Sequence, residues 1–418
     1  MNDSNLLDVG ERLFPSGLIP SIAGFLIYTG LLCLIMRLKM GLKRQICLLV
    51  INLAAVAWLA APAKDGLISA DAYLSVMPGL AAYLITVCSI YFLTRLLAFG
   101  KHWWIPAMMP IAILILLRYG PQPIQVSTIA WIGFSYMAFR LSQLVVIVRS
   151  NITEMPSILD YLNFAFFAPT ILAGPINAYS TFQKSYYQPD TQTTPPFHCL
   201  MRILIGSCKL LFLGSVLNRL TYKGLLMDFH PHPPVDLVVS AVAYYLYLYC
   251  NFSGYCDVAI GASGLAGIKV SENFNNPFAA RNIQDFWNRW HITLSSFMRD
   301  MCFNPLCKAL IARMPISMAP HAIALTICIV FTLIGMWHGR DPHFVAYGAV
   351  HALGVVTNHY YGLALKKYLS KDQLRRYNSS NLVRYICIAA TFIFVTSSLS
   401  LLANTFMELF TILYLIRT

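Results

Sequence analysis

The stretch FWNRWHITLSSFMRD, residues 286–300, places four titratable side chains among large aromatic residues. A helix that faces lipid does not readily carry Arg289 and Arg299, because a charged side chain in hydrocarbon is costly. A solvated loop, in turn, has no need of so much aromatic surface. We therefore expect this stretch to lie either at the membrane interface, with its aromatic side chains as anchors, or inside the protein against an aqueous cavity.

The same stretch has the pattern of one amphipathic helix. We expect this helix to run from Ile283 to Asp300, a length of about 27 Å. Asn282 suits the N-cap position, and Asp285 at the third position forms part of a capping box. Asp285 and Arg289 are four residues apart, so they can pair on one face of the helix.

The whole chain has the composition of a polytopic membrane protein. Of its 418 residues, 58% are hydrophobic and 11% are charged, whereas soluble domains are roughly 45–50% apolar and about 25% charged. A transmembrane helix needs about 20 apolar residues, so we expect an all-α membrane protein with about ten or eleven transmembrane helices. The clear apolar blocks are Leu18–Met36, Ile46–Ala61, Gly79–Phe99, Trp103–Leu117, Ile129–Val148, Met201–Leu217, Val235–Cys250, Ala322–Trp337, Phe344–Leu365 and Tyr385–Tyr414.

Charge asymmetry between the loops predicts the orientation, because short cytoplasmic loops are enriched in Lys and Arg. The net charge of +13 is mostly this loop bias, which favours contact with anionic lipid headgroups. No nucleic-acid-binding motif is found. Both termini are expected outside if Tyr385–Tyr414 crosses once. The residues behind this prediction are Arg37, Lys39, Lys43, Arg44, Arg95, Lys101 and His102 inside; Lys64, Asp65 and Asp71 in a neutral outer loop; Lys366, Lys367, Lys371, Arg375, Arg376 and Arg384 inside; and the acidic Asp3, Asp8 and Glu11, which argue against a cleavable signal peptide.

Cysteine and histidine usage gives no metal site. Most of the eleven cysteines lie within apolar blocks, where Cys behaves as a small hydrophobe. Two polar segments, Asn177–Pro196 and Tyr222–Pro234, are interpreted as loops. The second contains His230 and His232, flanked by proline, which are interpreted as part of a solvated loop and not as a metal site.

A second polar site is GMWHGRDPHF, which places His338 at the end of the block Ala322–Trp337. That block of about 16 residues would make a helix of roughly 24 Å, shorter than a bilayer core of about 30 Å. Gly339 suits a helix C-terminus, and Pro342 prevents the helix from continuing. We therefore expect His338 at or below the membrane surface, beside a helix end.

His291 and His338 are interpreted as functional, because polar residues at depth in a membrane mark pathways and sites. A neutral imidazole is the commonest general base, and here it would deprotonate an alcohol that attacks a thioester. No GxSxG elbow occurs, so direct transfer fits better than an acyl-enzyme. The remaining histidines of the membrane region are expected only to hydrogen-bond a neighbouring helix; these are His102, His198, His321, His343, His351 and His359.

Taken in order, the motifs resemble the membrane-bound O-acyltransferase (MBOAT) family. RWH within FWNRWH and WHG within GMWHG are preceded by NFSGYCDVAIGASGLAGIKVSENFNNPF and by FFAPTILAGPINAYSTFQ, and are followed by FVAYGAVHALGVVTN. Similar stretches cover residues 159–358, within a single integral membrane domain of residues 1–418. The resemblance is strongest to the D-alanyl-transfer, DltB-like branch.

The resemblance implies a fold and a site. The family fold is a ring of tilted helices around a thinned centre, with a tunnel that joins the two membrane faces. His338 corresponds to the catalytic histidine and His291 to a second functional histidine. The candidate residues that line or support the tunnel are Trp287, Arg289, Trp290, Trp337, Asn251, Tyr255 and Asp257.

The resemblance also implies the substrates. DltB-like proteins of the bacterial cytoplasmic membrane transfer D-alanine from a cytosolic phosphopantetheinyl carrier protein to an extracytoplasmic teichoic-acid acceptor. We thus expect no bound cofactor or metal, and an acceptor that is an envelope polymer or a partner acyltransferase. Where members of this branch have an acidic residue after GPI, this chain has Asn177. A polysaccharide O-acetyltransferase that uses an acetyl donor such as acyl-CoA therefore stays open.

The segment PLCKALIARM, residues 305–314, offers a docking site for the acidic carrier protein, since a basic rim around an apolar patch steers such a partner. An ordinary cytoplasmic amphipathic turn has the same pattern. Two other function classes also remain, a transporter or flippase and a non-catalytic scaffold. The candidate carrier contacts are Leu306, Lys308, Leu310, Ile311 and Arg313.

Overall fold

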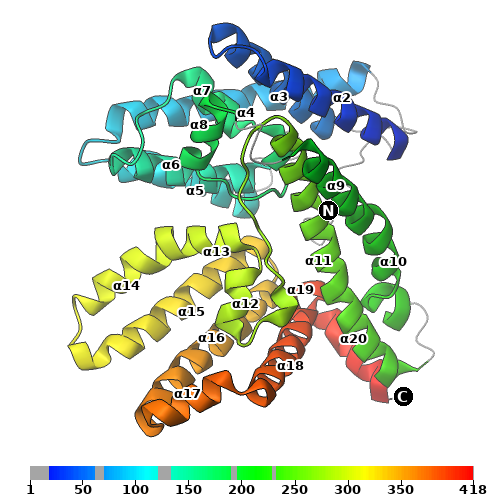
Figure 1. Cartoon of the computed structure of the whole chain (residues 1–418), viewed down its shortest axis with the longest axis vertical. Coiled ribbons are helices and arrows are strands. Elements are labelled where there is room, and N and C mark those ends of the chain that lie inside the picture. Colours follow the sequence, from blue (N-terminus) through cyan, green and yellow to red (C-terminus); the bar gives the residue numbers. More distant parts are fainter. Residues whose placement is uncertain (1–17, 62–69, 121–132, 190–194, 228–231, 418) are drawn as a thin grey trace. The chain divides into compact units, whose positions relative to one another are not determined.

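The computed structural model describes residues 18–61, 70–120, 133–189, 195–227 and 232–417, which are helices and short connections (Figure 1). Within these residues the β-structure consists of one isolated bridge between Phe274 and Trp290. The chain divides into two compact units. The described residues of the N-terminal unit are 18–211 and 251–272 with the gaps above, and those of the C-terminal unit are 212–250 and 273–417.

The N-terminal unit is built from long apolar helices and three short elements. Its helices are α2 (Leu18–Met36), α3 (Leu42–Ala60), α4 (Ala70–Leu97), α5 (Trp104–Tyr119), α6 (Phe134–Arg149), α7 (Ile158–Ala165), the 3₁₀ turn Ala168–Thr170, α8 (Tyr179–Tyr187) and α9 (Pro196–Ser207). A π-helical segment, Cys208–Leu213, continues α9 across the boundary of the units. The long helix α11 (Pro233–Leu265) contributes its C-terminal part to this unit.

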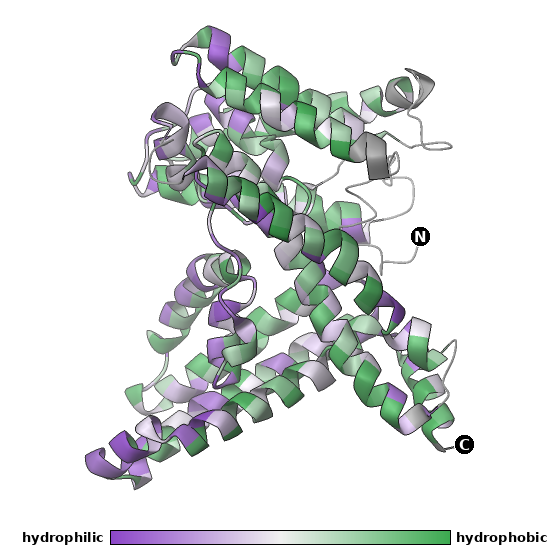
Figure 2. Ribbon diagram, turned by 45° about the vertical axis from the view of Figure 1, so that its right-hand side comes forward, coloured by the Kyte–Doolittle hydropathy of each residue, from purple (hydrophilic) through white to green (hydrophobic). Residues whose placement is uncertain are grey.

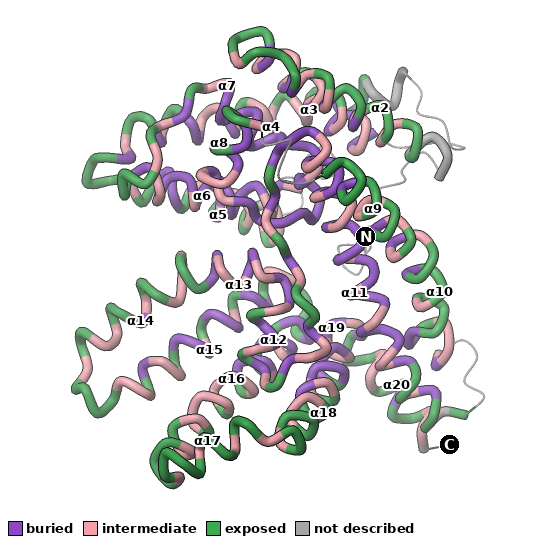
Figure 3. Tube along the Cα trace, in the orientation of Figure 1, coloured by how far each residue is buried: buried purple, intermediate pink, exposed green. Residues whose placement is uncertain are grey.

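The C-terminal unit contains the remaining helices. These are α10 (Gly214–Arg219), the π-helical segment Tyr222–Met227, the N-terminal part of α11, the 3₁₀ turn Pro277–Ala279, α12 (Ile283–Arg289), α13 (Ile292–Met298), the π-helical segment Arg299–Phe303, α14 (Asn304–Ile311), the 3₁₀ turn Ile316–Met318, α15 (Ala319–His338), α16 (Pro342–Tyr368), α17 (Lys371–Ser379), α18 (Asn381–Ser398), α19 (Ser400–Ala403) and α20 (Phe406–Arg417). No residue of α17 is buried, and most of them are exposed (Figure 3).

The prediction of an all-helical polytopic membrane protein is confirmed. Figure 2 shows hydrophobic residues along the long helices. Six helical segments among the described residues are long and apolar enough to cross a membrane, and three further apolar helices are shorter. The expected total of ten or eleven crossings, and the ring with its tunnel, stay predictions. The six segments are Leu42–Ala60, Leu74–Leu97, Pro196–Met227, Pro234–Leu265, Ile316–His338 and Asn381–Ala403; the shorter ones are Ile22–Met36, Trp104–Tyr119 and Phe406–Ile416.

Two predicted loops are wrong in part. Within Asn177–Pro196 the chain forms α8, whose aromatic side chains Tyr179, Phe182 and Tyr186 are buried. Within Tyr222–Pro234 the first six residues form the π-helical segment. Polarity and proline content suggested loops, but aromatic residues three to four positions apart bury one face of a short helix against the unit.

Of the two histidines in the second segment, the structure describes His232 only. His232 precedes α11, and its backbone N–H donates to the Asp236 carboxylate at 2.7 Å. His230, Lys64 and Asp65 lie outside the described residues, as do the acidic residues Asp3, Asp8 and Glu11.

Two helix lengths also differ from prediction. α15 starts at Ala319, so it has 20 residues and spans about 30 Å, which matches a bilayer core. The prediction of a short helix before His338 is therefore wrong, although His338 does end the helix. The block Tyr385–Tyr414 is not one helix, because the chain breaks between α19 and α20 at Asn404, whose backbone is extended. Asn381–Ala403 is long enough to cross a membrane and Phe406–Ile416 is a shorter apolar helix, so the single crossing and the outside position of both termini stay predictions.

A buried charge organises the N-terminal unit. Arg140 on α6 is 1% exposed, and its guanidinium donates to the Thr170 hydroxyl at 2.9 Å and to the Ala165 carbonyl at 3.1 Å. Asn52 on α3 accepts a hydrogen bond from the backbone N–H of Ala168 at 3.1 Å. These bonds satisfy the irregular backbone of the FFAPTILAGPI segment, which could not otherwise be buried away from water.

In the C-terminal unit, α15 and α16 form a closely packed hairpin that positions the end of α15. A Cβ atom on Gly348 would lie 2.4 Å from the carbonyl oxygen of Phe331, and one on Gly335 would lie 2.5 Å from that of Phe344. Small residues at such contacts let two helix backbones approach, as is common between membrane helices. The hairpin therefore depends on glycine at both positions.

Gly348→Ala is expected to destabilise the protein by about 1–3 kcal/mol, because the added methyl group would push against a backbone carbonyl that cannot rotate away. Thermal unfolding in detergent measures this. Gly362→Ala, on the same helix, is the matched control: nothing lies within 4 Å of its Cβ position, so the better helix propensity of Ala predicts no loss. Equal effects of the two substitutions would contradict this packing.

Candidate active site

The predicted helix Ile283–Asp300 is broken in the structure at His291. α12 ends at Arg289 and α13 begins at Ile292, and His291 between them has φ 46° and ψ 52°, in the left-handed region. A residue with a side chain reaches that conformation at a cost of about 1 kcal/mol or more. The prediction of one continuous helix is thus wrong, and the break places His291 at the N-terminus of α13.

The break is caused by pairing with the segment that follows α11. The backbone N–H of Asn275 donates to the Arg289 carbonyl at 2.9 Å, and the N–H of Ile292 donates to the Asn273 carbonyl at 3.0 Å. Phe274 and Trp290 form the isolated antiparallel bridge. Backbone groups that a continuous helix would use internally are here satisfied by a neighbouring strand-like segment.

Local capping behaves largely as the sequence predicts. Asn282 accepts a hydrogen bond from the backbone N–H of Asp285 at 2.8 Å, and Asp285 pairs with Arg289 at 2.8 Å. The expected capping box is incomplete, because the Asp285 carboxylate accepts from the N–H of Arg281 at 3.0 Å instead of from Asn282.

Asn273 fixes the His291 ring. Its side-chain Oδ1 accepts from the backbone N–H of Thr293 at 3.2 Å and from the Thr293 hydroxyl at 2.9 Å, and it lies 3.1 Å from His291 Nδ1. A backbone N–H can only donate, so this atom of Asn273 is the carbonyl oxygen and His291 Nδ1 must carry a hydrogen to bond it. In the neutral ring Nε2 therefore holds the lone pair.

His291 is buried, with 4% of its surface exposed. Burial, together with the nearby His338, lowers the pKa of the His291 imidazole from its ordinary value to about 3. The ring is therefore neutral at physiological pH, with a donor at Nδ1 and an acceptor at Nε2. This arrangement suits holding a hydroxyl group better than titrating.

His291 and His338 meet at one indole. The ring of Trp337 lies 6.3 Å, centroid to centroid, from His291 and 4.9 Å from His338. His338, unlike His291, is half-buried. A Cβ atom on Gly339 would lie 1.9 Å from the Phe344 ring, so glycine is needed where the chain leaves His338. The structure thus brings together the two histidines that the sequence singled out.

A second group of rings continues the cluster beyond His338. Tyr347 makes an edge contact with His338 at 5.6 Å and lies 4.5 Å from His351, which in turn lies 5.2 Å from Trp287. His351 Nε2 lies 2.9 Å from the Ser398 hydroxyl on α18, which is the hydrogen bond to a neighbouring helix that the sequence predicted. Neither Tyr347 nor Ser398 was singled out in the sequence, because their roles depend on how the helices pack.

Two polar atoms of this cluster have no hydrogen-bond partner within the described part of the chain. They are Trp287 Nε1 and His351 Nδ1, both buried. Buried polar atoms are nearly always hydrogen-bonded to protein or water. We expect a water molecule or a polar group of a substrate at these two atoms.

The Trp290 ring is buried in an aromatic core. Its ring stacks on Phe286 at 5.6 Å and makes an edge contact with Phe274 at 5.0 Å, with Tyr245 at 5.9 Å. This aromatic core holds α12 against α11, so the candidate Trp290 supports the site from behind. Arg289 is occupied by its pair with Asp285.

Three candidate residues, Asn251, Tyr255 and Asp257, belong to the N-terminal unit. Tyr255 donates its hydroxyl to the Pro169 carbonyl at 2.9 Å. In the same unit Asn177, which stands in the GPINAY run, donates to the Lys269 carbonyl at 3.1 Å and accepts from Ser271 at 2.9 Å. These contacts tie the proline-glycine segment to the chain that follows α11.

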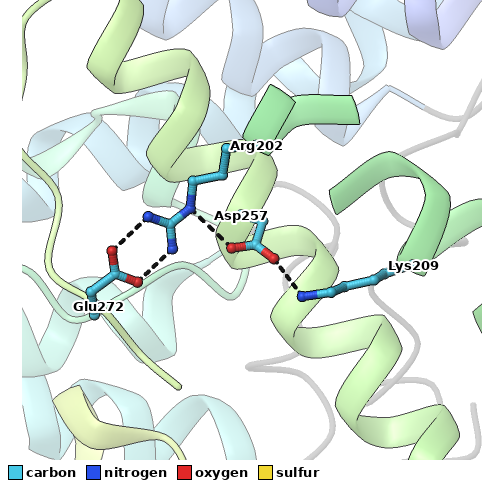
Figure 4. A network of polar contacts seen from close by, with 4 residues as sticks. All are labelled: Arg202, Lys209, Asp257 and Glu272. Atoms are coloured by element: carbon cyan, nitrogen blue, oxygen red, sulfur yellow. Dashed lines mark hydrogen bonds and ion pairs between the residues drawn. The ribbon is translucent and has the colours of Figure 1, made fainter. Parts of the chain in front are cut away.

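Asp257 lies in an ion-pair network that the sequence did not reveal (Figure 4). Its carboxylate binds Arg202 at 3.0 Å and Lys209 at 2.7 Å, and Arg202 also binds Glu272. The network joins two candidate membrane spans, Pro196–Met227 and Pro234–Leu265, where unpaired charges would be costly. α9 can approach α11 because glycine faces glycine: a Cβ atom on Gly206 would lie 2.6 Å from the Gly254 carbonyl oxygen.

The predicted carrier-protein contacts lie on α14 and the turn after it. Lys308 and Arg313 are exposed, whereas Leu306, Leu310 and Ile311 are half-buried. The helix is therefore amphipathic, with its basic side chains in solvent. Among the described residues, no group of three or more His, Cys, Asp or Glu side chains could hold a metal ion.

Comparisons with known proteins show which family the chain matches. Residues 80–402 match the model of MBOAT, the membrane-bound O-acyltransferase family. A teichoic acid D-alanyltransferase of Bacillus subtilis is 31% identical over 244 residues, which cover 57% of this chain and 62% of the relative. The teichoic acid D-alanyltransferase of Streptococcus thermophilus is 29% identical, over 59% of this chain and 61% of the relative.

A third relative has a different acceptor in its name. A peptidoglycan O-acetyltransferase of Helicobacter pylori is 31% identical over 213 residues, which cover 50% of this chain and 39% of the relative. The matched region thus spans less than two thirds of the length of each of these three relatives.

Asn273→Ala is expected to release the His291 ring and the start of α13 together, because it removes a carbonyl that binds three groups. The loss of these hydrogen bonds predicts a destabilisation of about 1–3 kcal/mol. Asn275→Ala is the matched control, since the Asn275 side chain is exposed. Thermal unfolding of the two purified variants tests this, and an Asn273→Ala protein as stable as the Asn275→Ala protein would refute the bracing role.

Proposed function

Because this chain belongs to the membrane-bound O-acyltransferase family, we propose that it transfers an acyl group from a cytosolic thioester to a hydroxyl group of an extracytoplasmic envelope polymer. The observation that carries the proposal is the contact of His291 and His338 with the same indole, Trp337, with His338 half-buried and His291 held neutral. The chain is membrane-integral, which suits a donor and an acceptor on opposite sides.

The proposed reaction is a direct transfer. His338 removes the proton of the acceptor hydroxyl as its oxygen attacks the thioester carbonyl carbon, which gives a tetrahedral oxyanion. When the intermediate collapses, the carbon–sulfur bond breaks and the thiolate takes the proton back from the imidazolium. One ester bond forms, one thioester bond breaks, and His338 returns to its neutral state.

The other side chains of the cluster have supporting roles in this proposal. The lone pair on His291 Nε2 can accept a hydrogen bond from a neighbouring hydroxyl group of the acceptor or from a water molecule, and so orient the acceptor while His338 takes the reacting proton. The N–H of Trp287, which has no partner among the described residues, can donate to the oxyanion or to a water molecule beside it. Preorganised donors of this kind contribute about 3–4 kcal/mol each where they contact the developing charge.

The donor proposed is a D-alanyl thioester of a phosphopantetheinyl carrier protein, and the protein would act in the bacterial cytoplasmic membrane. Two relatives named as teichoic acid D-alanyltransferases support this choice. The acceptor would be a teichoic-acid-type polymer or a partner acyltransferase that passes the group on. A second candidate is O-acetylation of a polysaccharide from an acetyl donor, which is favoured by the relative named as a peptidoglycan O-acetyltransferase and by the neutral Asn177.

His338→Ala and His338→Gln are each expected to lower transfer by about 10²–10⁴-fold, the usual contribution of a general base. The measurement is release of label from a loaded donor in proteoliposomes with acceptor present. His321→Gln is the matched control, because His321 is exposed and hydrogen-bonds the Tyr360 hydroxyl on α16, away from the proposed chemistry. Full transfer by both His338 variants would overturn the base role, and substrate movement without any new bond would favour a transporter.

The donor is identified in the same assay. Labelled D-alanyl carrier protein, loaded acyl carrier protein and acetyl-CoA are offered separately to the intact protein. Label is expected to leave the D-alanyl carrier protein fastest. Transfer from acetyl-CoA alone would refute the carrier-protein donor and select the O-acetyltransferase.

The carrier protein is proposed to dock on α14. Charge reversal by K308E and R313E is expected to slow transfer from an acidic carrier by about tenfold or more, because electrostatic steering acts mainly on the rate of association. The effect should be on kcat/KM and should shrink at high salt. K371E with R375E, which reverses two exposed charges on α17, is the control; an equal loss there would mean that overall charge matters, and not α14.

A further inference from the structure

A cavity of about 450 Å³ lies within the C-terminal unit, at the start of α12 and among α16, α17 and α18. That volume is in the range of about 300–1,000 Å³ typical of sites for small ligands. Arg281, Lys366 and Arg384 line it, and none of its lining residues is acidic. The proposed reaction uses none of these residues.

The three cations are available for a ligand. No ion pair between described residues involves any of them, and all three side chains are exposed. Three positive charges around one hollow repel each other unless an anion joins them. The charge of the cavity lining therefore favours a negatively charged group.

Hydrogen bonds between helices hold the walls of the cavity. Asn358 on α16 donates to Gln284 on α12 at 3.4 Å, and the hydroxyl groups of Tyr361 and Tyr377 lie 3.1 Å apart between α16 and α17. His359 also lines the cavity, and its Nε2 is buried without a hydrogen-bond partner among the described residues. The hollow is thus built by four elements and is not a gap beside one flexible loop.

The position of the cavity along α18 indicates where the anion comes from. α18 begins the candidate membrane span Asn381–Ala403, and Arg384 lies in its first turn. On the same first turns Leu382, Tyr385 and Ile386 are 70%, 67% and 58% exposed. Exposed apolar and tyrosine side chains beside basic residues are typical of the level of lipid headgroups. A ligand with a phosphate in the cavity can lay its acyl chains along α18.

We propose that this basic cavity binds the headgroup phosphate of an anionic phospholipid. Basic pockets between membrane helices recognise such headgroups through charge and hydrogen bonds. Arg281 and Arg384 would each present a forked guanidinium to the phosphate oxygens, and Lys366 would add a point charge. A bound lipid would hold the polar helix α17 against α16 and α18.

The test is native mass spectrometry of the detergent-solubilised full chain titrated with phosphatidylglycerol and, separately, with phosphatidylcholine of the same acyl chains. The intact protein is expected to retain phosphatidylglycerol in preference. R281Q/K366Q/R384Q should weaken phosphatidylglycerol retention by about tenfold or more, because each basic residue near a headgroup adds to binding. Thermal unfolding shows whether the variant remains folded.

The matched control is K367Q/R375Q/R376Q, which removes the same charge from exposed residues of α16 and α17 outside the cavity. This variant should change retention less than about twofold. Equal losses in the two variants, or equal binding of phosphatidylcholine, would overturn the proposal. The source of the phosphate is tested by adding soluble glycerol phosphate or phosphopantetheine. If phosphopantetheine binds the cavity and displaces phosphatidylglycerol, the site belongs to a thioester donor and the lipid proposal fails.

Discussion

The candidate site depends on one side-chain carbonyl, that of Asn273. It accepts hydrogen bonds from the Thr293 backbone N–H, the Thr293 hydroxyl and the His291 ring at once. These bonds stabilise the left-handed conformation of His291, which would otherwise be unfavourable compared with a continuous helix. The same bond determines which nitrogen of His291 bears the hydrogen. Backbone shape and imidazole chemistry are thus decided by a single interaction, and every proposed role of His291 follows from it.

His338 is positioned by a different constraint, the close packing of α15 on α16. Gly335 and Gly348 allow the two backbones to touch, and Gly339 leaves room for the Phe344 ring. In a membrane the hydrophobic effect does not drive helices together, so they associate through close van der Waals packing. Small residues at the contact make that packing possible. The hairpin holds His338 beside Trp337 and Tyr347, so this imidazole is positioned by helices and not by a loop.

Sequence patterns predicted a helix well where an uninterrupted apolar run alone determines its ends. The block Leu18–Met36 coincides with α2. His291 and His338 were singled out because burying polar residues in a membrane is costly, and the structure places both rings beside Trp337. Predictions failed where the local conformation depends on contacts with residues that are distant in sequence. The break at His291 requires Asn273, and the earlier start of α15 reflects Pro320 in a first turn, where proline is tolerated despite the polar His321 beside it. The network around Asp257 needs a helix contact that hydropathy cannot reveal.

The central claim is that a thioester and an alcohol meet where His338 and His291 contact Trp337. An experimental structure of the protein in lipid, bound to a non-hydrolysable analogue of the aminoacyl thioester, tests this most directly. The quantity to measure is the distance from the carbonyl carbon of the analogue to the nearest nitrogen of His338. A separation of about 3–5 Å, with room for an alcohol oxygen between them, is the expected result. An analogue that occupies another site, with His338 packed only against lipid, would contradict the account.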